Sequence, residues 1–256
     1  MTSPRRTMQP PAQTAIPFVQ GSGLELVFQE RDAGNLLPLD RDPRDVSNWR
    51  LLQGLTVVSP YDIPKIQACT LVPERLVSFS EAVCMKRPDA TAWVHFYEDD
   101  YRFERFWRCP EKYLERLRAF AGVISPDFSL YRNMPIAQKI HNTFRNQLLG
   151  AWLQARGLEV VANVRISGRD STAYALAGTP HCSTLALGLH GCTKDVANRR
   201  HVIEEIQLVC EVCRPQNLVV YGSAMYGVLE PAHALDIPVH VYAPDHRFRS
   251  AHREAA

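Results

Sequence analysis

Short hydrophobic runs alternate with helical stretches along most of this chain, and this alternation limits the architectures open to it. From residue 62 onward, seven runs of aliphatic and aromatic residues are separated by segments with helical periodicity or helix signals. The predicted strands are 63–68, 91–97, 123–125, 158–166, 184–190, 218–221 and 239–242. Strands that alternate with helices form parallel sheets covered by helices, so the sequence predicts an α/β fold.

The expected helices lie between these strands. Pro110 and Pro135 each open a helix, and Gly122 and Gly157 close them. Asp195 is the expected N-cap of a helix that runs to 214. Further helical segments are expected at 73–85, 101–107, after 172 and near 225–235.

Polar residues at the strand ends favour one of two architectures. They are Asp99, Asp100, Asp127, Asn163, Arg165, His190 and Ser223. In an open doubly wound sheet only the strands beside the switch point need polar ends, whereas a barrel brings every strand end to one mouth. We therefore expect a TIM-like or incomplete β/α barrel, with the open doubly wound sheet as the alternative.

The expected domain organisation has four parts. Residues 1–23 are rich in Pro and Gln and are predicted to be extended or disordered. Residues 24–60 are expected to be an irregular region packed on a single β/α domain at 61–245, which is followed by a basic tail at 246–256.

Composition excludes several classes of protein. Hydrophobic residues make up 46% of 256, enough for a full core, and no run approaches the ~18 apolar residues of a membrane span. The net charge of +2 is too small to indicate, by itself, a strongly basic surface that binds nucleic acid. An apolar signal core is missing at the start, and seven cysteines are typical of reduced thiols, so we expect a cytoplasmic protein of unspecified oligomeric state.

Five segments carry a resemblance. They are HFYEDDYRFE at 95–104, GVISPDFSLY at 122–131, NVR at 163–165, HGC at 190–192 and YGS at 221–223. With these segments the chain resembles a family of bacterial, phage and plasmid proteins catalogued as Domain of Unknown Function 4417. The resemblance implies a setting of phages, plasmids or other mobile elements, and it assigns no catalytic role to any residue.

Arg165 is the most informative candidate for substrate binding. On a strand, Asn163 and Arg165 share one face and the aliphatic side chains beside them share the other, so Arg165 is predicted to point into the mouth. A guanidinium removed from water needs an anion. That anion is either a substrate phosphate or carboxylate, which Asn163 would help to bind, or an internal carboxylate such as Asp127 or Asp100.

Asp127, Asp100 and His190 are the candidate catalytic residues. Asp127 ends a strand, where it can be a general base, a metal ligand or the partner of Arg165; otherwise it starts an Asx-turn. His190 can exchange protons near neutral pH, or can simply form a hydrogen bond at a loop start. Asp99 and Asp100 could hold a divalent cation, but acidic runs more often cap a helix. We therefore predict no metal site and name no cofactor.

Three further residues are candidates for substrate binding. Ser223 ends a strand before a helix, where free N–H groups can bind phosphate, although the glycines of a dinucleotide fingerprint are missing. Asn142 and Arg145 lie with Gln138 and Asn146 on one stripe of the helix that Pro135 opens. Such a stripe is usually solvated; the alternative is bidentate contact with a base, phosphate or carboxylate.

Cys210 and Cys213 form a CxxC pair, but both continue an apolar helical face and are predicted to be core residues. Together these features predict an enzyme of the hydrolase or transferase class that acts on an anionic substrate such as a nucleotide or nucleic acid. The alternative is a non-catalytic protein of a mobile element that binds nucleic acid or protein. Its electrostatic contacts would be Arg5, Arg6, His246, Arg247, Arg249, His252 and Arg253.

Overall fold

Seven parallel strands form the centre of the protein, as seen in a computed structural model that describes residues 29–33, 45–189 and 195–244. The strands are β4 (Arg75–Ser78), β5 (Ala92–His95), β6 (Gly122–Ile124), β7 (Val160–Asn163), β8 (Thr184–Gly188), β9 (Asn217–Tyr221) and β10 (Val239–Tyr242). Their order in the sheet is β10-β9-β8-β7-β6-β5-β4, and every adjacent pair is parallel. The predicted α/β class is confirmed.

The sheet is curved into an incomplete barrel. Each strand pairs only with its neighbours in the sequence, so there is no switch point of the kind that a doubly wound sheet requires. His95 on β5 and Tyr221 on β9 are four strands apart, which is roughly 19 Å in a flat sheet. Their ring centroids are nevertheless 4.3 Å apart. The expectation of an incomplete β/α barrel is confirmed, and the open doubly wound alternative is excluded.

The two edge strands, β4 and β10, face each other across the remaining gap. They do not pair through their backbones. The phenol of Tyr242 on β10 instead donates to the carbonyl of Pro73, just before β4. The barrel is therefore one strand short of eight, with side chains across the opening.

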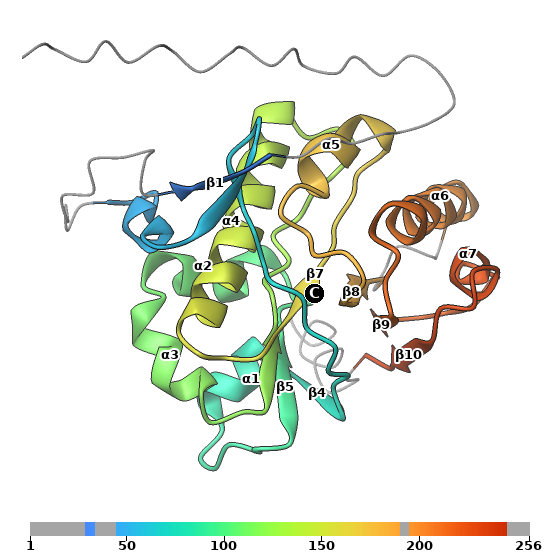
Figure 1. Ribbon diagram of the computed structural model, residues 1–256. Helices are drawn as coiled ribbons and strands as arrows, with labels where there is room; N and C mark the ends of the chain where they lie inside the picture. Colours follow the sequence, from blue (N-terminus) through green and yellow to red (C-terminus); the bar gives the residue numbers. More distant parts are fainter. Residues whose placement is uncertain (1–28, 34–44, 190–194, 245–256) are drawn as a thin grey trace, which may run out of the picture.

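Helices follow the strands and surround them (Figure 1). In chain order they are α1 (Phe79–Cys84), α2 (Asp100–Arg108), α3 (Glu111–Leu117), α4 (Ile136–Ala155), α5 (Thr172–Ala175), α6 (Val196–Cys213) and α7 (Glu230–His233). The Asp195 side chain caps α6 by accepting from the Asn198 N–H at 3.2 Å, as expected. None of the described helices combines the length and apolarity needed to cross a membrane.

The two faces of the barrel have separate cores. Residues that point outward pack against the helices; they include Val94, Val123, Val160, Ala162, Leu185, Leu218 and Val220. Residues that point inward fill the barrel, and these include Trp93, Ile124, Val161, Ala186, Val219 and Tyr221. This alternation positions Asn163 and Arg165 on the inner side, as the two-residue period predicts.

The first predicted strand was wrong. Within 63–68, only Ile63–Pro64 is a strand (β3), and it belongs to a separate antiparallel sheet with β1 (Gln29–Asp32) and β2 (Thr56–Ser59). The first barrel strand is β4, inside the stretch expected to be helical from 73 to 85. Ser78 ends β4 and also caps α1 by accepting from the Glu81 N–H at 3.3 Å. Since no loop separates strand from helix, the sequence there reads as one element.

The region expected to be irregular, 24–60, contains part of this small sheet and a 3-10 helix, Trp49–Leu52. Its buried side chains Leu51, Leu52 and Val57 join the core that lies under the helices. The segments predicted to be extended or basic, 1–23 and 246–256, lie outside the described residues.

Candidate functional site

A cavity of about 1270 Å³ lies at the carboxyl ends of the barrel strands. It is lined by residues from both edges of the sheet, such as Ser78 at the end of β4 and Tyr242 on β10, and from the centre, such as Arg165 after β7. The volume exceeds the roughly 300–1,000 Å³ typical of small-molecule pockets. The predicted shared mouth is therefore present and is large enough for a substantial ligand.

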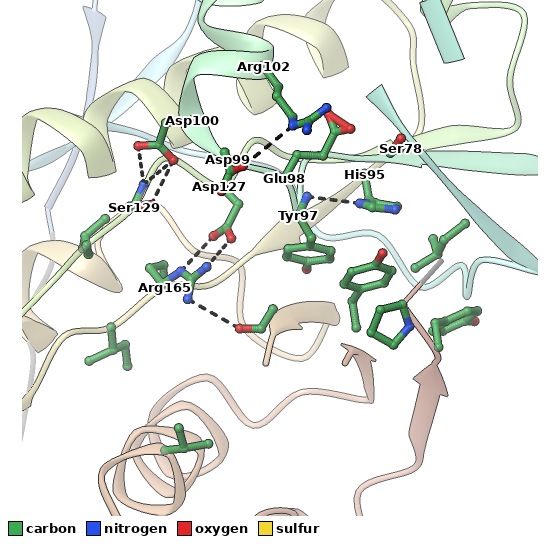
Figure 2. Close-up of a pocket in the computed structure, with 18 of the residues that line it drawn as sticks. Ser78, His95, Tyr97, Glu98, Asp99, Asp100, Arg102, Asp127, Ser129 and Arg165 are labelled. Carbon is green, nitrogen blue, oxygen red and sulfur yellow. Dashed lines mark hydrogen bonds and ion pairs between the residues drawn. The ribbon is translucent and has the colours of Figure 1, made fainter. Parts of the chain in front are cut away.

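Arg165 and Asp127 form an ion pair in this cavity (Figure 2). Arg165 Nε donates to Asp127 Oδ1 at 2.9 Å, and Nη2 donates to Oδ2. Nη1 donates to the carbonyl of Gly188 at 3.4 Å. The Asp127 side chain is 4% exposed and the Arg165 side chain is 25% exposed. Of the internal partners considered for Arg165, the structure therefore shows Asp127, and the Arg165 side chain remains partly exposed where it lines the cavity.

Asn163 and Tyr97 complete a hydrogen-bonded group around this pair. Asn163 Nδ2 donates to Asp127 Oδ1 at 2.8 Å and to the Pro126 carbonyl at 3.3 Å. The Tyr97 phenol donates to Asn163 Oδ1 at 3.1 Å. Asn163 is thus engaged at both ends of its amide, so in this arrangement it holds Asp127 in place.

Burial changes the acidity of these groups. It raises the pKa of Asp127 above its ordinary value, and the Arg165 charge opposes that shift only in part. Burial, reinforced by the Asp127 charge, also raises the pKa of Tyr97 well above 10. Asp127 therefore gains a proton more readily than an exposed aspartate.

Glu205 on α6 is a further carboxylate of the cavity, and sequence reasoning missed it. Its Oε1 accepts from the Gly168 N–H at 3.2 Å and lies 3.5 Å from Arg132 Nη2. Burial is the main cause that raises its pKa, while Arg132 and Arg165 oppose the shift. With Asn198 and His201 it forms a polar stripe at helical spacing that lines the cavity beside the apolar face of α6. That stripe was the available sequence signal.

Stacked rings cross the barrel at the cavity. Tyr97 and Tyr221 are stacked with centroids 5.1 Å apart, and His95 stacks on Tyr97 at 5.4 Å. The Tyr97 N–H donates to His95 Nδ1 at 3.1 Å, so this nitrogen is unprotonated. All three residues are buried and line the cavity. They give the site an aromatic floor beside the Arg165–Asp127 pair.

Asp100 and Asp99 line the cavity but have protein partners. Asp100 accepts from the Ser129 hydroxyl at 2.9 Å and from the Ser129 N–H at 3.2 Å. Asp99 lies 3.8 Å from Arg102 Nε. Within the described ranges, no three His, Cys, Asp or Glu side chains are grouped as ligands for a metal ion.

The expectation of a solvated stripe on the long helix was wrong. On α4, Asn142, Arg145 and Asn146 are buried, because the connection from β6 and helix α2 cover that face. Arg145 pairs with Glu104, and its guanidinium lies 3.5 Å from the centroid of the Phe128 ring. In the part of the chain that the structure describes, neither Asn142 nor Arg145 lines the cavity.

The remaining candidates lie apart from this group. Ser223 follows β9 and accepts from the Met225 N–H at 3.4 Å; it is absent from the described lining of the cavity. His190 lies outside the described residues, as does the basic tail. Cys210 and Cys213 are fully buried on α6, as predicted.

Comparison with known proteins finds one matching protein family and two similar phage proteins. The family model described as "Domain of unknown function (DUF4417)" matches residues 55–237. The chain is 32% identical over 187 residues to the Gene 1 protein of Mycobacterium phage D29, covering 71% of this chain and 67% of the relative. It is 30% identical over 183 residues to the Gene 1 protein of Mycobacterium phage L5, covering 70% of this chain and 78% of the relative. No solved structure matches.

Proposed function

This chain belongs to the DUF4417 family, and we propose that it is an enzyme, a hydrolase or transferase, acting on a small anionic substrate in the barrel cavity. The observation that carries the proposal is the partly exposed side chain of Arg165 in that cavity, whose guanidinium is held by a buried carboxylate. A preorganised guanidinium recognises phosphate and carboxylate groups through directed N–H donors.

Glu205 is the group best placed to exchange protons with the substrate. Its side chain is 24% exposed, whereas that of Asp127 is 4% exposed with both oxygens bonded. Both contacts to Glu205 described above end at Oε1. A raised pKa suits a carboxyl group to general acid–base catalysis near neutral pH. We assign proton transfer to Glu205 and assign to Asp127 the positioning of Arg165.

The charges support this division of roles. Within the two ion pairs of this part of the cavity, ionised Asp127 and Glu205 balance the charges of Arg165 and Arg132. When Glu205 takes up a proton, Asp127 is the one charged carboxylate left in these two pairs, against two guanidinium groups. An anionic substrate then gains electrostatic attraction, and the protonated Glu205 can donate to a leaving group.

We also propose that the protein acts in the cytoplasm, in the setting of a phage or other mobile element. The phage Gene 1 relatives support the setting, and the free cysteines of the described chain suit a reducing compartment. The binding alternative relies on basic residues that lie outside the described residues, whereas the paired acids and arginines in the barrel cavity support the enzyme.

Ligand-dependent thermal stability tests the proposal. Inorganic phosphate, ribose 5-phosphate, nucleotides and short carboxylic acids are each added to the wild type, Arg165→Met and Arg118→Met. Arg118 is the control because it is exposed and absent from the described cavity lining. We expect an anion to raise the melting temperature of wild type and the Arg118 variant but not of the Arg165 variant. No response to any anion, or an equal response in the Arg165 variant, contradicts the proposal.

A further inference from the structure

Tyrosine is concentrated around the cavity. Five of the nine tyrosines of the chain line it, namely Tyr97, Tyr101, Tyr131, Tyr221 and Tyr242. By contrast, no phenylalanine or tryptophan among the described residues does so. Tyrosine offers a flat apolar ring together with a polar group, a combination suited to a ligand with both characters.

Two of these tyrosines differ from the rest in their exposure. Tyr101 is 68% exposed and Tyr131 is 62% exposed, whereas Tyr97 and Tyr221 are buried in the floor. Tyr101 lies in the first turn of α2, and Tyr131 lies in the connection between β6 and α4. We call this pair the rim tyrosines. Both residues are mostly exposed to solvent although they border the cavity.

Hydrogen bonds link the segment that carries Tyr101 to the segment that carries Tyr131. Asp100, adjacent to Tyr101, accepts from both the N–H and the hydroxyl of Ser129, two residues before Tyr131. Asn142 on α4 then donates to the Ser129 carbonyl at 2.8 Å. Asp100 and Asn142, candidates for catalysis and substrate binding, therefore fix the position of the rim instead. Exposed rings on braced segments are preorganised for contact with a ligand.

Each rim tyrosine is followed by an arginine that also lines the cavity. Arg102 follows Tyr101 and lies 3.8 Å from Asp99. Arg132 follows Tyr131, is 43% exposed at its side chain and lies 3.5 Å from Glu205. The rim thus places a ring and a guanidinium side by side on two segments. A tyrosine ring can stack on a planar heterocycle, and the neighbouring guanidinium can bind a phosphate linked to it.

The overall charge of the lining favours a small ligand over a strand. Among the described lining residues there are seven carboxylates and four arginines. A nucleic-acid strand carries a negative charge at every nucleotide and would be repelled by this excess. A mononucleotide carries one phosphate, which Arg132 and Arg165 can face.

We infer that the anionic substrate is a mononucleotide, whose base stacks on the rim tyrosines while its phosphate faces Arg132 and Arg165. This inference rests on the proposed function and names the substrate class for the same cavity. It gives Tyr101 and Tyr131 a direct role in binding, and Asp100, Ser129 and Asn142 a role in positioning them.

Calorimetric titration of the full chain tests the inference. The ligands are the four ribonucleoside monophosphates, ribose 5-phosphate, adenosine and a single-stranded oligonucleotide. We expect at least one nucleotide to bind, and ribose 5-phosphate to bind at least tenfold more weakly than that nucleotide. Tyr101→Ala and Tyr131→Ala should each weaken nucleotide binding roughly tenfold, since one base–aromatic stack contributes that much. Tyr131→Phe should retain it.

Tyr226→Ala is the matched control, because Tyr226 is 56% exposed but absent from the described lining. It should bind nucleotides as the wild type does. If ribose 5-phosphate binds as tightly as the nucleotides, the stacking inference fails and the anion-binding function stands. Tighter binding of the oligonucleotide overturns the choice of a mononucleotide. If none of these phosphate compounds binds, the inference fails, and the carboxylic acids of the preceding experiment decide separately on the proposed function.

Discussion

Asp127 receives hydrogen bonds at both carboxylate oxygens from the single guanidinium of Arg165, across the end of the barrel between β6 and β7. Removing one partner of such a pair costs more than removing both, because a lone buried charge has no compensation. The pair therefore fixes the inner wall of the cavity, and its members cannot be exchanged independently.

Arg165→Met is expected to lower the free energy of unfolding by about 3 kcal/mol, near the lower end for buried pairs because Arg165 is partly exposed. The double variant Asp127→Asn with Arg165→Met should recover part of this loss, since the neutral amide still accepts from Asn163. Urea unfolding of both variants measures the difference. A single variant as stable as the wild type would show that the pair contributes nothing to the fold.

Gly188 on β8 is required by the side chains around it. A Cβ at this position would lie 2.6 Å from Tyr97 Cδ1 and 3.3 Å from Asp127 Oδ2. We predict that Gly188→Ala destabilises the protein by about 1–3 kcal/mol, the usual cost of overpacking a core. Adding Tyr97→Leu should relieve the clash, so the two changes together should cost less than their sum. Additive losses in thermal melts would contradict this account.

The β/α alternation predicted the fold class, six of the seven barrel strands and the location of the cavity, because backbone periodicity and strand ends are local properties of the sequence. Asn163 and Arg165 were placed on the inner face by the two-residue period alone. The structure shows this placement, with both residues bonded to Asp127. The partner of Arg165 could not be derived, since Asp127 is 38 residues away and register across strands is a tertiary property.

Three other features were missed, each for a different reason. The burial of Asn142 and Arg145 depends on segments that lie over α4, which the polarity of the stripe does not reveal. The first barrel strand was missed because β4 runs directly into α1 at Ser78. Glu205 was overlooked because the apolar face of α6 alone was used to interpret that helix.

Cys210 and Cys213 should behave as core residues. Burial raises the pKa of Cys210 to about 11 and that of Cys213 to about 12, so both thiols stay protonated and unreactive at neutral pH. Native protein treated with a thiol reagent should be labelled at the exposed Cys84, Cys109 and Cys182 but not at this pair. Replacing both with Ala should cost about 1 kcal/mol per site without changing zinc content. Stoichiometric zinc lost in the double variant would overturn this.

Glu205 should make stability depend on pH in a defined direction. Its pKa is raised in the folded protein above the ordinary 4.5, mainly by burial, so the folded state holds this proton at pH values where the unfolded state has lost it. The folded state then binds more protons than the unfolded state just above pH 4.5. The contribution of Glu205 to the free energy of unfolding therefore falls as pH rises through that interval.

Glu205→Gln removes this contribution, so the stability of wild type relative to the variant should be highest at acidic pH and should decline as pH rises above 4.5. Urea unfolding of both proteins at a series of pH values measures the difference in their free energies of unfolding. Other carboxylates contribute equally to both proteins and cancel in this difference. One of them is Asp89, whose pKa is lowered by hydrogen bonds from Thr91, so that its contribution has the opposite trend. Arg132→Met tests the cause. Arg132 opposes the rise in the pKa of Glu205, so in the Arg132→Met background the stability conferred by Glu205 should decline over a range that reaches higher pH. If the stability difference between wild type and Glu205→Gln does not vary with pH, burial does not alter the protonation of Glu205.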